Sequence, residues 1–244
     1  MAQPITCMKQ WKQILNSMDR INPLISMMIE FESRTGLRYA DASQLKFSDV
    51  MKNGKPRDSF DLVQTKPYKM RVNRIEKEEE IRFRELDLLA GSLDESELVK
   101  RRAKLIASMK KKRAEAKQKS KVTVGVSEGL KDLIMQLYDY NGDHALIFQS
   151  RHHHAAPNKA ISRSYINRAL KRVGAEVGVN FDLSSHSMRK TFATLLMNNR
   201  ANSKTISKLL GHSSVAITDA YLHSCKNDEI EAAISLSFDA GEDE

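Results

Sequence analysis

The chain has 244 residues, with 40 Lys and Arg against 31 Asp and Glu, and 41% of its residues are hydrophobic. That length is enough to bury a core, and two cysteines, Cys7 and Cys225, cannot form a disulfide framework. No apolar run approaches the roughly 18–20 residues of a membrane span, and the N-terminus lacks the order of a signal peptide, so we expect a cytoplasmic protein with no membrane partner.

The net charge of +9 is unevenly distributed. Residues 100–121 hold 11 basic residues and one acid, whereas residues 74–97 hold nine acids and four bases, and residues 228–244 hold seven acids and no base. The rest of the chain is basic as well. This balance points to a polyanionic partner such as nucleic acid, with a solvated basic surface as the alternative.

The first third of the chain predicts three helices and two strands. The predicted helices are 5–16 with Thr6 as the N-cap, 24–31 after Pro23, and 40–45. The predicted strands are 46–50 and 59–65, with a turn at Asn53-Gly54 between them.

Residues 73–120 differ from their surroundings, since they are rich in Glu, Lys, Arg, Leu and Ala and contain no proline. Gly91-Ser92 interrupts the stretch, and Ser92 with Glu95 resembles a capping box that opens a second helix. One face of that helix would carry Leu98, Leu105, Ile106 and Met109. The pattern predicts a charged helical hairpin, or one long helix, inserted into the domain; a solvated helix without a partner is the alternative.

The last part of the chain predicts a strand over 121–126, the expected partner of 59–65, and then mostly helices. These helices are expected from Ser127 to residue 140, over 162–174, over 186–198, from Asn202 or Ser203 to Gly211, and after Ser213 or Ser214. The expected fold is therefore α+β and mainly α, with a small antiparallel sheet.

Several polar residues are not required by packing. Arg38 lies in an apolar region, and His186 and Arg189 share one face at the start of a helix, where free N–H groups suit a phosphate. His212 follows the helix-ending Gly211, and Tyr221 lies nine residues further on. Each alone has an ordinary explanation as a surface charge, a helix cap or a half-buried ring.

Together these residues form a pattern. The segments 35–41 (TGLRYAD), 186–194 (HSMRKTFAT), 209–214 (LLGHSS) and 221–223 (YLH) resemble, in this order, the catalytic domain of the tyrosine recombinases, the phage integrase family. The resemblance covers roughly residues 4–72 and 120–225. It implies phosphoryl transfer at a DNA phosphodiester, where charge develops on the non-bridging oxygens and fixed positive donors are needed.

The resemblance also implies roles for individual residues. Arg38 and Arg189 would bind the scissile phosphate, and Tyr221 would be the nucleophile that becomes joined to the 3′ phosphate. His186 would accept the phenol proton, His212 would hydrogen-bond the phosphate or orient the site, and Asp41 would support the site.

The leaving 5′ hydroxyl requires an acid, which the family supplies as a lysine from a turn of its small sheet. Lys66, at the end of the predicted strand 59–65, is the first choice, although Pro67 directly after it departs from the usual pattern. Lys69 and Lys121 are the alternatives.

No cofactor is expected. The covalent intermediate would conserve the phosphodiester energy, so ATP is not needed, and Arg and His would supply the positive charge, so metal is not needed. His152-His153-His154 could suggest a metal site, but adjacent loop residues rarely provide tetrahedral geometry, and a DNA-facing or solvated loop is expected instead.

The expected organisation is a catalytic domain over 1–227, with the insertion at 73–120, followed by an acidic tail over 228–244 that docks on another protomer or covers the basic groove. Only about 35 residues precede Arg38, so we expect the family's N-terminal DNA-binding domain to be absent, as in the fimbrial phase-variation recombinases that this short form resembles. The insertion would then supply DNA contacts or bind a neighbouring protomer. The candidate DNA-binding residues are Lys100, Arg101, Arg102, Lys110, Lys111, Lys112 and Arg113.

The resemblance thus implies a site-specific recombinase acting on double-stranded DNA, as a homotetramer on two sites. Such a protein would be associated with the nucleoid. Whether the outcome is integration, excision, inversion or resolution, and whether an accessory DNA-bending protein takes part, are left open. The alternatives are a type IB topoisomerase-like activity, which uses a similar site to relax DNA, and a DNA-binding regulator that keeps the fold without the activity.

Overall fold

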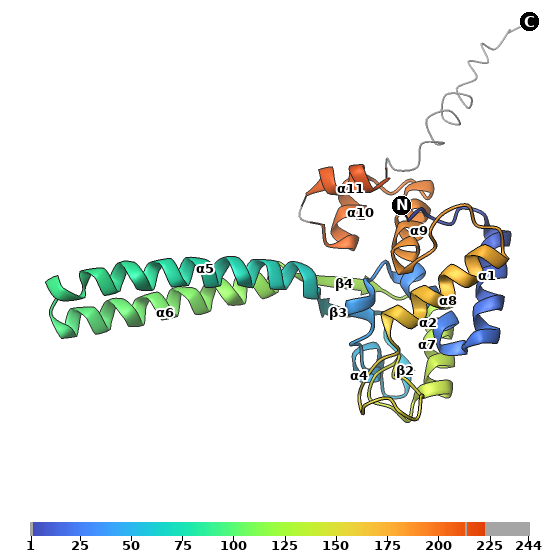
Figure 1. Cartoon of the computed structure of the whole chain (residues 1–244), viewed down its shortest axis with the longest axis horizontal. Coiled ribbons are helices and arrows are strands. Elements are labelled where there is room, and N and C mark those ends of the chain that lie inside the picture. Colours follow the sequence, from blue (N-terminus) through green and yellow to red (C-terminus); the bar gives the residue numbers. More distant parts are fainter. Residues whose placement is uncertain (1, 213, 223–244) are drawn as a thin grey trace, which may run out of the picture. The chain divides into compact units, whose positions relative to one another are not determined.

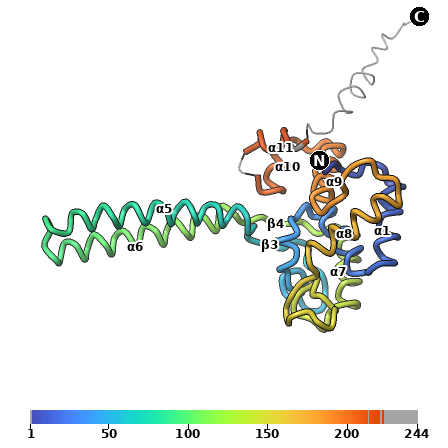
Figure 2. The backbone as a smooth tube through the Cα atoms, in the orientation of Figure 1, coloured from blue at the N-terminus to red at the C-terminus, as the bar shows by residue number. Residues whose placement is uncertain are grey.

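The computed structural model describes residues 2–212 and 214–222 (Figures 1 and 2). Contacts divide this part of the chain into two units. The helical unit comprises residues 2–36, 162–207 and 214–222, and the sheet unit comprises residues 37–161 and 208–212. The acidic segment 228–244 and Cys225 lie outside the described residues.

The helical unit is built around α2 (Pro23–Thr35), which packs against α1 (Met8–Ile21) and α9 (Ser185–Asn198). Pro23 occupies the first turn of α2, and the Asn22 side chain caps the helix by accepting from the Leu24 N–H at 3.0 Å. The remaining helices are α8 (Arg163–Glu176), α11 (Val215–Leu222) and the first residues of α10 (Ser203–Leu210). The predicted buried helix after Pro23 is confirmed, as are the helices expected in the C-terminal third.

The predicted Thr6 cap is wrong, because α1 begins at Met8 with Cys7 in the N-cap position. The segment before it is anchored at Ile5, whose N–H donates to Thr191 Oγ1 at 2.9 Å and whose side chain is buried. The choice between Asn202 and Ser203 is settled for Asn202, whose side chain accepts from the Thr205 N–H at 2.8 Å.

The sheet unit contains two short antiparallel pairs. β1 (Met51–Lys52) and β2 (Lys55–Pro56) are joined by the predicted turn, in which Asn53 and Gly54 have φ of 52° and 74°. β3 (Ser59–Val63) pairs with β4 (Lys121–Gly125), with Ser59 opposite Gly125 and Val63 opposite Lys121, which confirms the expected pairing.

The strand predicted over 46–50 is wrong. After α3 (Tyr39–Ala42), the structure has a short helix, α4 (Phe47–Val50), because the Asp49 side chain accepts from the Lys46 N–H at 2.9 Å and so caps the first turn. This local hydrogen bond favours a helix over the strand that the apolar residues predicted. Within 46–50, only Lys46 makes a β-bridge, with Leu146.

The stretch between β3 and β4 is a helical hairpin, formed by α5 (Thr65–Leu89), the short 3₁₀ turn η1 (Ala90–Ser92) and α6 (Glu95–Gln118). It extends from the two strands as an antiparallel pair (Figure 1). Ile75, Met109 and Ala116 are buried between the helices, with Tyr68 and Leu105 packed against them. The hairpin is therefore a two-helix element with its own small core near the sheet, and it starts at Thr65 rather than at residue 73.

Two details of the predicted second helix are wrong. Its N-cap is Asp94, whose side chain accepts from the Glu97 N–H at 2.8 Å, whereas Ser92 donates to the Leu89 carbonyl. Ile106 is 55% exposed and lies off the buried face that Met109 marks. The carboxylate is the stronger acceptor for the N-terminal N–H groups.

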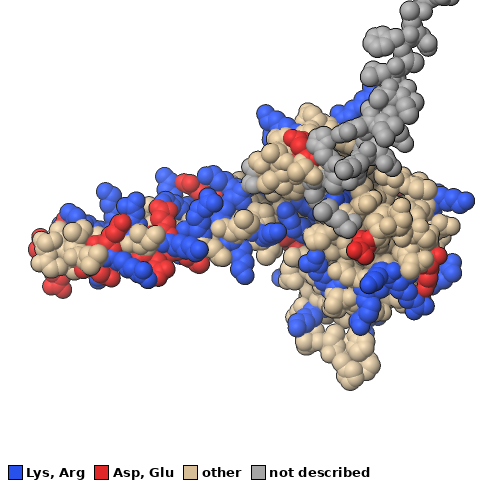
Figure 3. All heavy atoms as spheres, turned by 45° about the horizontal axis from the view of Figure 1, so that its top comes forward, with Lys and Arg blue, Asp and Glu red and all other residues tan. Residues whose placement is uncertain are grey.

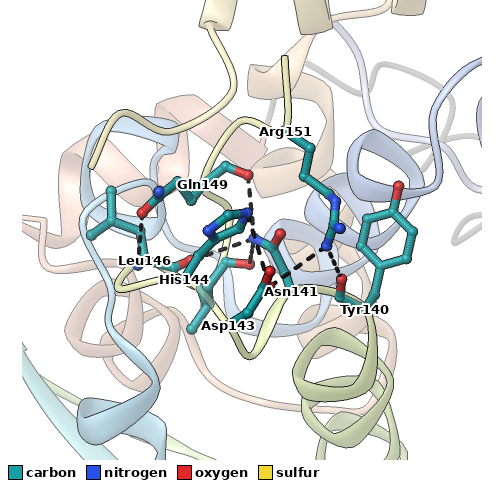
Figure 4. A network of polar contacts seen from close by, with 8 residues as sticks. Tyr140, Asn141, Asp143, His144, Leu146, Gln149 and Arg151 are labelled. Carbon is teal, nitrogen blue, oxygen red and sulfur yellow. Dashed lines mark hydrogen bonds and ion pairs between the residues drawn. The ribbon is translucent and has the colours of Figure 1, made fainter. Parts of the chain in front are cut away.

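A buried amide fixes the loop after α7 (Glu128–Asn141) in the sheet unit (Figure 4). The Nδ2 group of Asn141, which is fully buried, donates to the carbonyls of Leu146, Ile147 and Gln149 at 3.5, 3.2 and 3.2 Å. Arg151 closes the same loop from outside, through the Tyr140 carbonyl and the Asp143 carboxylate. No helix in the described part of the chain is long and apolar enough to cross a membrane.

Candidate active site

His186 and Arg189 lie in the first turns of α9, as predicted. The start of α9 is fixed by a capping box in which Ser184 and Ser187 exchange hydrogen bonds, and the Ser185 N–H donates to Asn167 Oδ1 at 3.2 Å. Two of the N–H groups expected to be free for phosphate are therefore used by protein side chains. The cationic side chain of Arg189 is the stronger candidate for a phosphate ligand in this unit.

Arg189 is almost completely buried, with 3% relative exposure, and its Nη1 donates to the Gly36 carbonyl at 2.5 Å. Gly36 ends α2 with a φ of 65°. A Cβ added there would lie 2.3 Å from the Phe192 ring, so both the backbone conformation and the space require glycine. The Thr35-Gly36 sequence thus ends α2 where its last carbonyls meet the guanidinium of α9.

Glu32 is the residue of this region that sequence reasoning missed. Its carboxyl is buried, and neither oxygen has a hydrogen-bond partner among the described residues. Burial raises the pKa of Glu32 well above its usual 4.5, and the charges of Arg163 and Arg189 only partly oppose this. The available signal was an acid inside an apolar helix, four residues before Gly36.

His186 is exposed, and its Nε2 lies 2.9 Å from Nη2 of Arg163, the first residue of α8. The structure thus places Arg163 beside the predicted base. No motif in the sequence indicated Arg163, because the two residues are 23 positions apart.

In the sheet unit, a glutamine connects two of the predicted residues. Arg38 precedes α3 and donates from Nη1 to Gln64 Oε1 at 2.8 Å, while Gln64 Nε2 donates to the Leu210 carbonyl at 3.1 Å. Gly211 has a φ of 61°, and a Cβ there would lie 2.3 Å from Gln64 Oε1. The buried Gln64 side chain therefore holds Arg38 to the segment that precedes His212.

Asp41 is buried, and its Oδ1 accepts from the Thr65 N–H at 2.7 Å, which fixes the start of α5. Lys66 follows in the first turn of α5, not at the end of a strand as we expected, because the strand stops at Val63. Lys66 and Lys69 are both exposed and have no carboxylate within 4.0 Å among the described residues. Lys121 instead forms an ion pair with Asp61 at 2.7 Å.

His212 is half-buried and directly follows Gly211. The backbone of Tyr221 lies in α11, the helix in which we expected it. The Tyr221 side chain, like Ser213, lies outside the described part of the structure.

The candidate DNA-binding residues of α6 fall into two groups. Arg102, Lys112 and Arg113 pair across the hairpin with Asp87, Glu78 and Glu79, and Arg101 pairs with Glu97 on its own helix. Lys100, Lys110 and Lys111 are exposed, with no carboxylate within 4.0 Å among the described residues. Basic and acidic side chains accordingly alternate along the hairpin (Figure 3).

Helical spacing adds one more residue to the second group. Lys100, Lys104 and Lys111 lie four and seven residues apart on α6, which puts them on one face, opposite Met109 and Ala116. We call these three residues the outer α6 lysines. Lys104 has no carboxylate within 4.0 Å in the described chain.

The described residues contain no group of three or more His, Cys, Asp or Glu side chains that could hold a metal ion. In an exposed loop, the rings of His152 and His153 are stacked with centroids 4.7 Å apart, and the ring of His154 is tilted against both, at 5.7 and 3.9 Å.

Comparison with known proteins gives matches at the levels of sequence family and of fold. The phage integrase family matches residues 83–228, more than half of the chain, a range that includes His186, Arg189, His212 and Tyr221. Tyrosine recombinase XerD of Staphylococcus epidermidis is 35% identical over 69 residues, which are 28% of this chain and 23% of XerD. XerC of Pediococcus pentosaceus is 36% identical over 90 residues, 37% of this chain and 28% of XerC. The matched segments thus span less than a third of the length of these relatives.

Among solved structures, XerA recombinase superposes with a TM-score of 0.58 and 16% identity, covering 96% of this chain and 65% of XerA. XerH recombinase bound to its palindromic difH substrate, in a post-cleavage complex, gives a TM-score of 0.57 at 16% identity, covering 97% of this chain and 54% of XerH. At such identity the likeness concerns the fold, a mainly helical domain with small antiparallel sheets.

Proposed function

This chain belongs to the phage integrase family, and on that premise we propose that it cleaves and rejoins double-stranded DNA at specific sites, through a covalent bond between Tyr221 and a 3′ phosphate. The observation that carries the proposal is the placement of the two arginines. Arg189 is buried against the Gly36 carbonyl, and only Leu37 separates Gly36 from Arg38 in the sequence. The chain therefore limits the Gly36–Arg38 Cα distance to about 7 Å, and the two guanidinium groups are proposed to bind the same phosphate.

The chemistry follows from the residue types. The Tyr221 oxygen forms a bond to phosphorus while the bond from phosphorus to the 5′ oxygen breaks. The phenol proton passes to His186, and the leaving 5′ oxygen takes a proton from Lys66. Arg38, Arg189 and His212 stabilise the charge on the non-bridging oxygens, and loss of one such donor is expected to cost about 3–4 kcal/mol of barrier.

Gln64 and Asp41 support this assignment from the sheet unit. Gln64 holds Arg38 by its Nη1 group, and Asp41 fixes the backbone that carries Lys66. Since Lys66 and Lys69 share a turn of α5 and both are exposed, Lys69 remains the alternative acid. Lys121, paired with Asp61, is the weaker candidate.

The outer α6 lysines, with Lys110, are proposed to contact the DNA backbone, since their charges are not paired in the described residues. The ion-paired Arg101, Arg102, Lys112 and Arg113 are proposed to stabilise the hairpin first and to add to its positive field second. The proposal takes the recombining assembly to be four protomers on two DNA sites.

The test uses a DNA duplex with a nick beside the cleavage position, which traps the covalent intermediate. The full chain is expected to form a denaturant-resistant protein–DNA adduct that Tyr221→Phe does not form. Tyr138→Phe, a change of a 43% exposed phenol on α7, is the control and should leave the adduct intact. An adduct with Tyr221→Phe would refute the assignment, and DNA binding without any adduct would favour the inactive regulator. Relaxation of supercoiled DNA regardless of sequence would favour the topoisomerase-like alternative.

A further inference from the structure

The contact between Arg163 and His186 determines which nitrogen of the imidazole carries a lone pair. Nη2 of Arg163 lies 2.9 Å from Nε2 of His186. A guanidinium is always charged and can only donate, so Nε2 must accept, and the proton of the neutral ring lies on Nδ1. The backbone around Arg163 is fixed, since Ser162 caps α8 by accepting from the Tyr165 N–H and Ile166 is fully buried.

Two described arginines belong to the charged surroundings of His186. Arg189 lies one turn further along α9, and Arg163 reaches His186 from α8. Glu32, on α2, interacts with both arginines, but burial keeps its carboxyl neutral over a wider pH range than usual. Asp219 on α11, the other helix packed against α9, has no cation within 4.0 Å among the described residues. A further positive charge, on the imidazole, is disfavoured beside these two arginines.

We propose that Arg163 is a positioning residue for His186, holding the imidazole unprotonated and with its lone pair on Nε2 until DNA binds. The catalytic part of this inference rests on the proposed function. A DNA phosphate is a stronger partner for a guanidinium than a neutral imidazole. DNA binding then draws Arg163 away from Nε2, and the lone pair becomes available to the phenol proton of Tyr221.

The first test needs no catalytic activity. The ¹⁵N signals of the His186 ring are followed by NMR in the DNA-free full chain, with His186→Gln used for assignment. In the parent protein, Nε2 is expected to be the acceptor nitrogen. In Arg163→Ala, the ring should become a mixture of tautomers, and its titration midpoint should move to higher pH by roughly 0.5–1 unit, since solvent screens an exposed pair.

Two variants serve as controls. Arg163→Lys keeps the cation and the donor and should restore most of the parent titration. Arg172→Ala, on the same helix and in an exposed pair with Glu176, should leave the His186 signals unchanged. The inference is overturned if His186 has the same tautomer and midpoint in Arg163→Ala as in the parent.

The second test measures the pH profile of adduct formation on the nicked duplex. Arg163→Ala is expected to move the acidic limb of the rate profile to higher pH by the same amount as the His186 midpoint, and Arg163→Lys should move it back. If the parent forms no adduct, the proposed function fails while the NMR result still decides the role of Arg163. If the parent forms the adduct and Arg163→Ala leaves the acidic limb in place, the positioning role fails and the proposed function stands.

Discussion

Replacing Glu32 by glutamine should remove a dependence of stability on pH. The Glu32 carboxyl is buried without a hydrogen-bond partner in the described residues, and burial raises its pKa above the usual 4.5. The folded state therefore keeps the proton at pH values where the unfolded state has lost it. The stability contribution of this group is complete below pH 4.5 and decreases as the pH rises through the folded-state pKa.

The size of this pH dependence follows from the single proton that Glu32 binds in the folded state. Within that window the free energy of unfolding should fall by up to about 1.4 kcal/mol per pH unit. Glu32→Gln cannot ionise, so the fall should disappear. Glu32→Met also removes the unpaired polar atoms and should stabilise the fold by a further amount of about 1–3 kcal/mol.

Urea unfolding measures this effect between about pH 5 and 8. The only tryptophan, Trp11, lies on α1 in the same unit as Glu32, so its fluorescence reports the relevant transition. Glu30→Gln, on the same helix, is the matched control and should keep the pH dependence of the parent. The reasoning is refuted if the free energy of unfolding of Glu32→Gln varies with pH as steeply as that of the parent.

Three further predictions concern two buried positions, Gly36 and Asn141, and the exposed outer α6 lysines. Gly36→Ala should lower the free energy of unfolding by about 2–4 kcal/mol in the Trp11 assay, because a Cβ there meets both the positive φ and the Phe192 ring. A loss well under about 1 kcal/mol would contradict this. Asn141→Leu should destabilise the sheet unit by about 2–4 kcal/mol, measured by circular dichroism in urea, since three carbonyls lose their donor; an unchanged midpoint would show that they find other partners. Alanine at all three outer α6 lysines should reduce the slope of log affinity for DNA against log salt by up to about 0.9 per lost contact, whereas alanine at the ion-paired Arg102, Lys112 and Arg113 should change it less; equal effects would argue against the distinction.

The sequence predicted the elements whose signals are local and strong. Pro23 and the apolar run after it marked α2, and the alternation in 59–65 and 121–126 marked the sheet across a gap of more than fifty residues. The strand expected at 46–50 failed because periodicity says nothing about a side-chain cap such as that of Asp49. The hairpin began earlier than expected because Pro67, at the third position of α5, is tolerated in the first turn of a helix.

The candidate site was predictable only where a motif carried it. Arg38, His186 and Arg189 were found from their neighbours in sequence, whereas Gln64, Arg163 and Glu32 were not. Gln64 bonds to Arg38, 26 positions away, and Arg163 contacts His186, 23 positions away. The charges that act on Glu32 come from arginines still further along the chain, and no local sequence pattern encodes such contacts. A glutamine after a strand and an arginine after a serine cap are common sequences, and only tertiary structure gives them a role.

The way the hairpin is joined to the sheet makes its length independent of the pairing between β3 and β4. Beyond the last pair of β3 and β4, the Gln64 N–H donates to the Ser120 carbonyl at 2.9 Å, so the two ends of the insertion are already closed at its root. Matched turns could be removed from or added to both helices without altering the strand register, and the entropy of closing that junction would change little, because even a doubling of the insertion costs only about 0.6 kcal/mol. The length of the hairpin could thus be adjusted, by design or by natural variation, without changing the residues of the candidate active site.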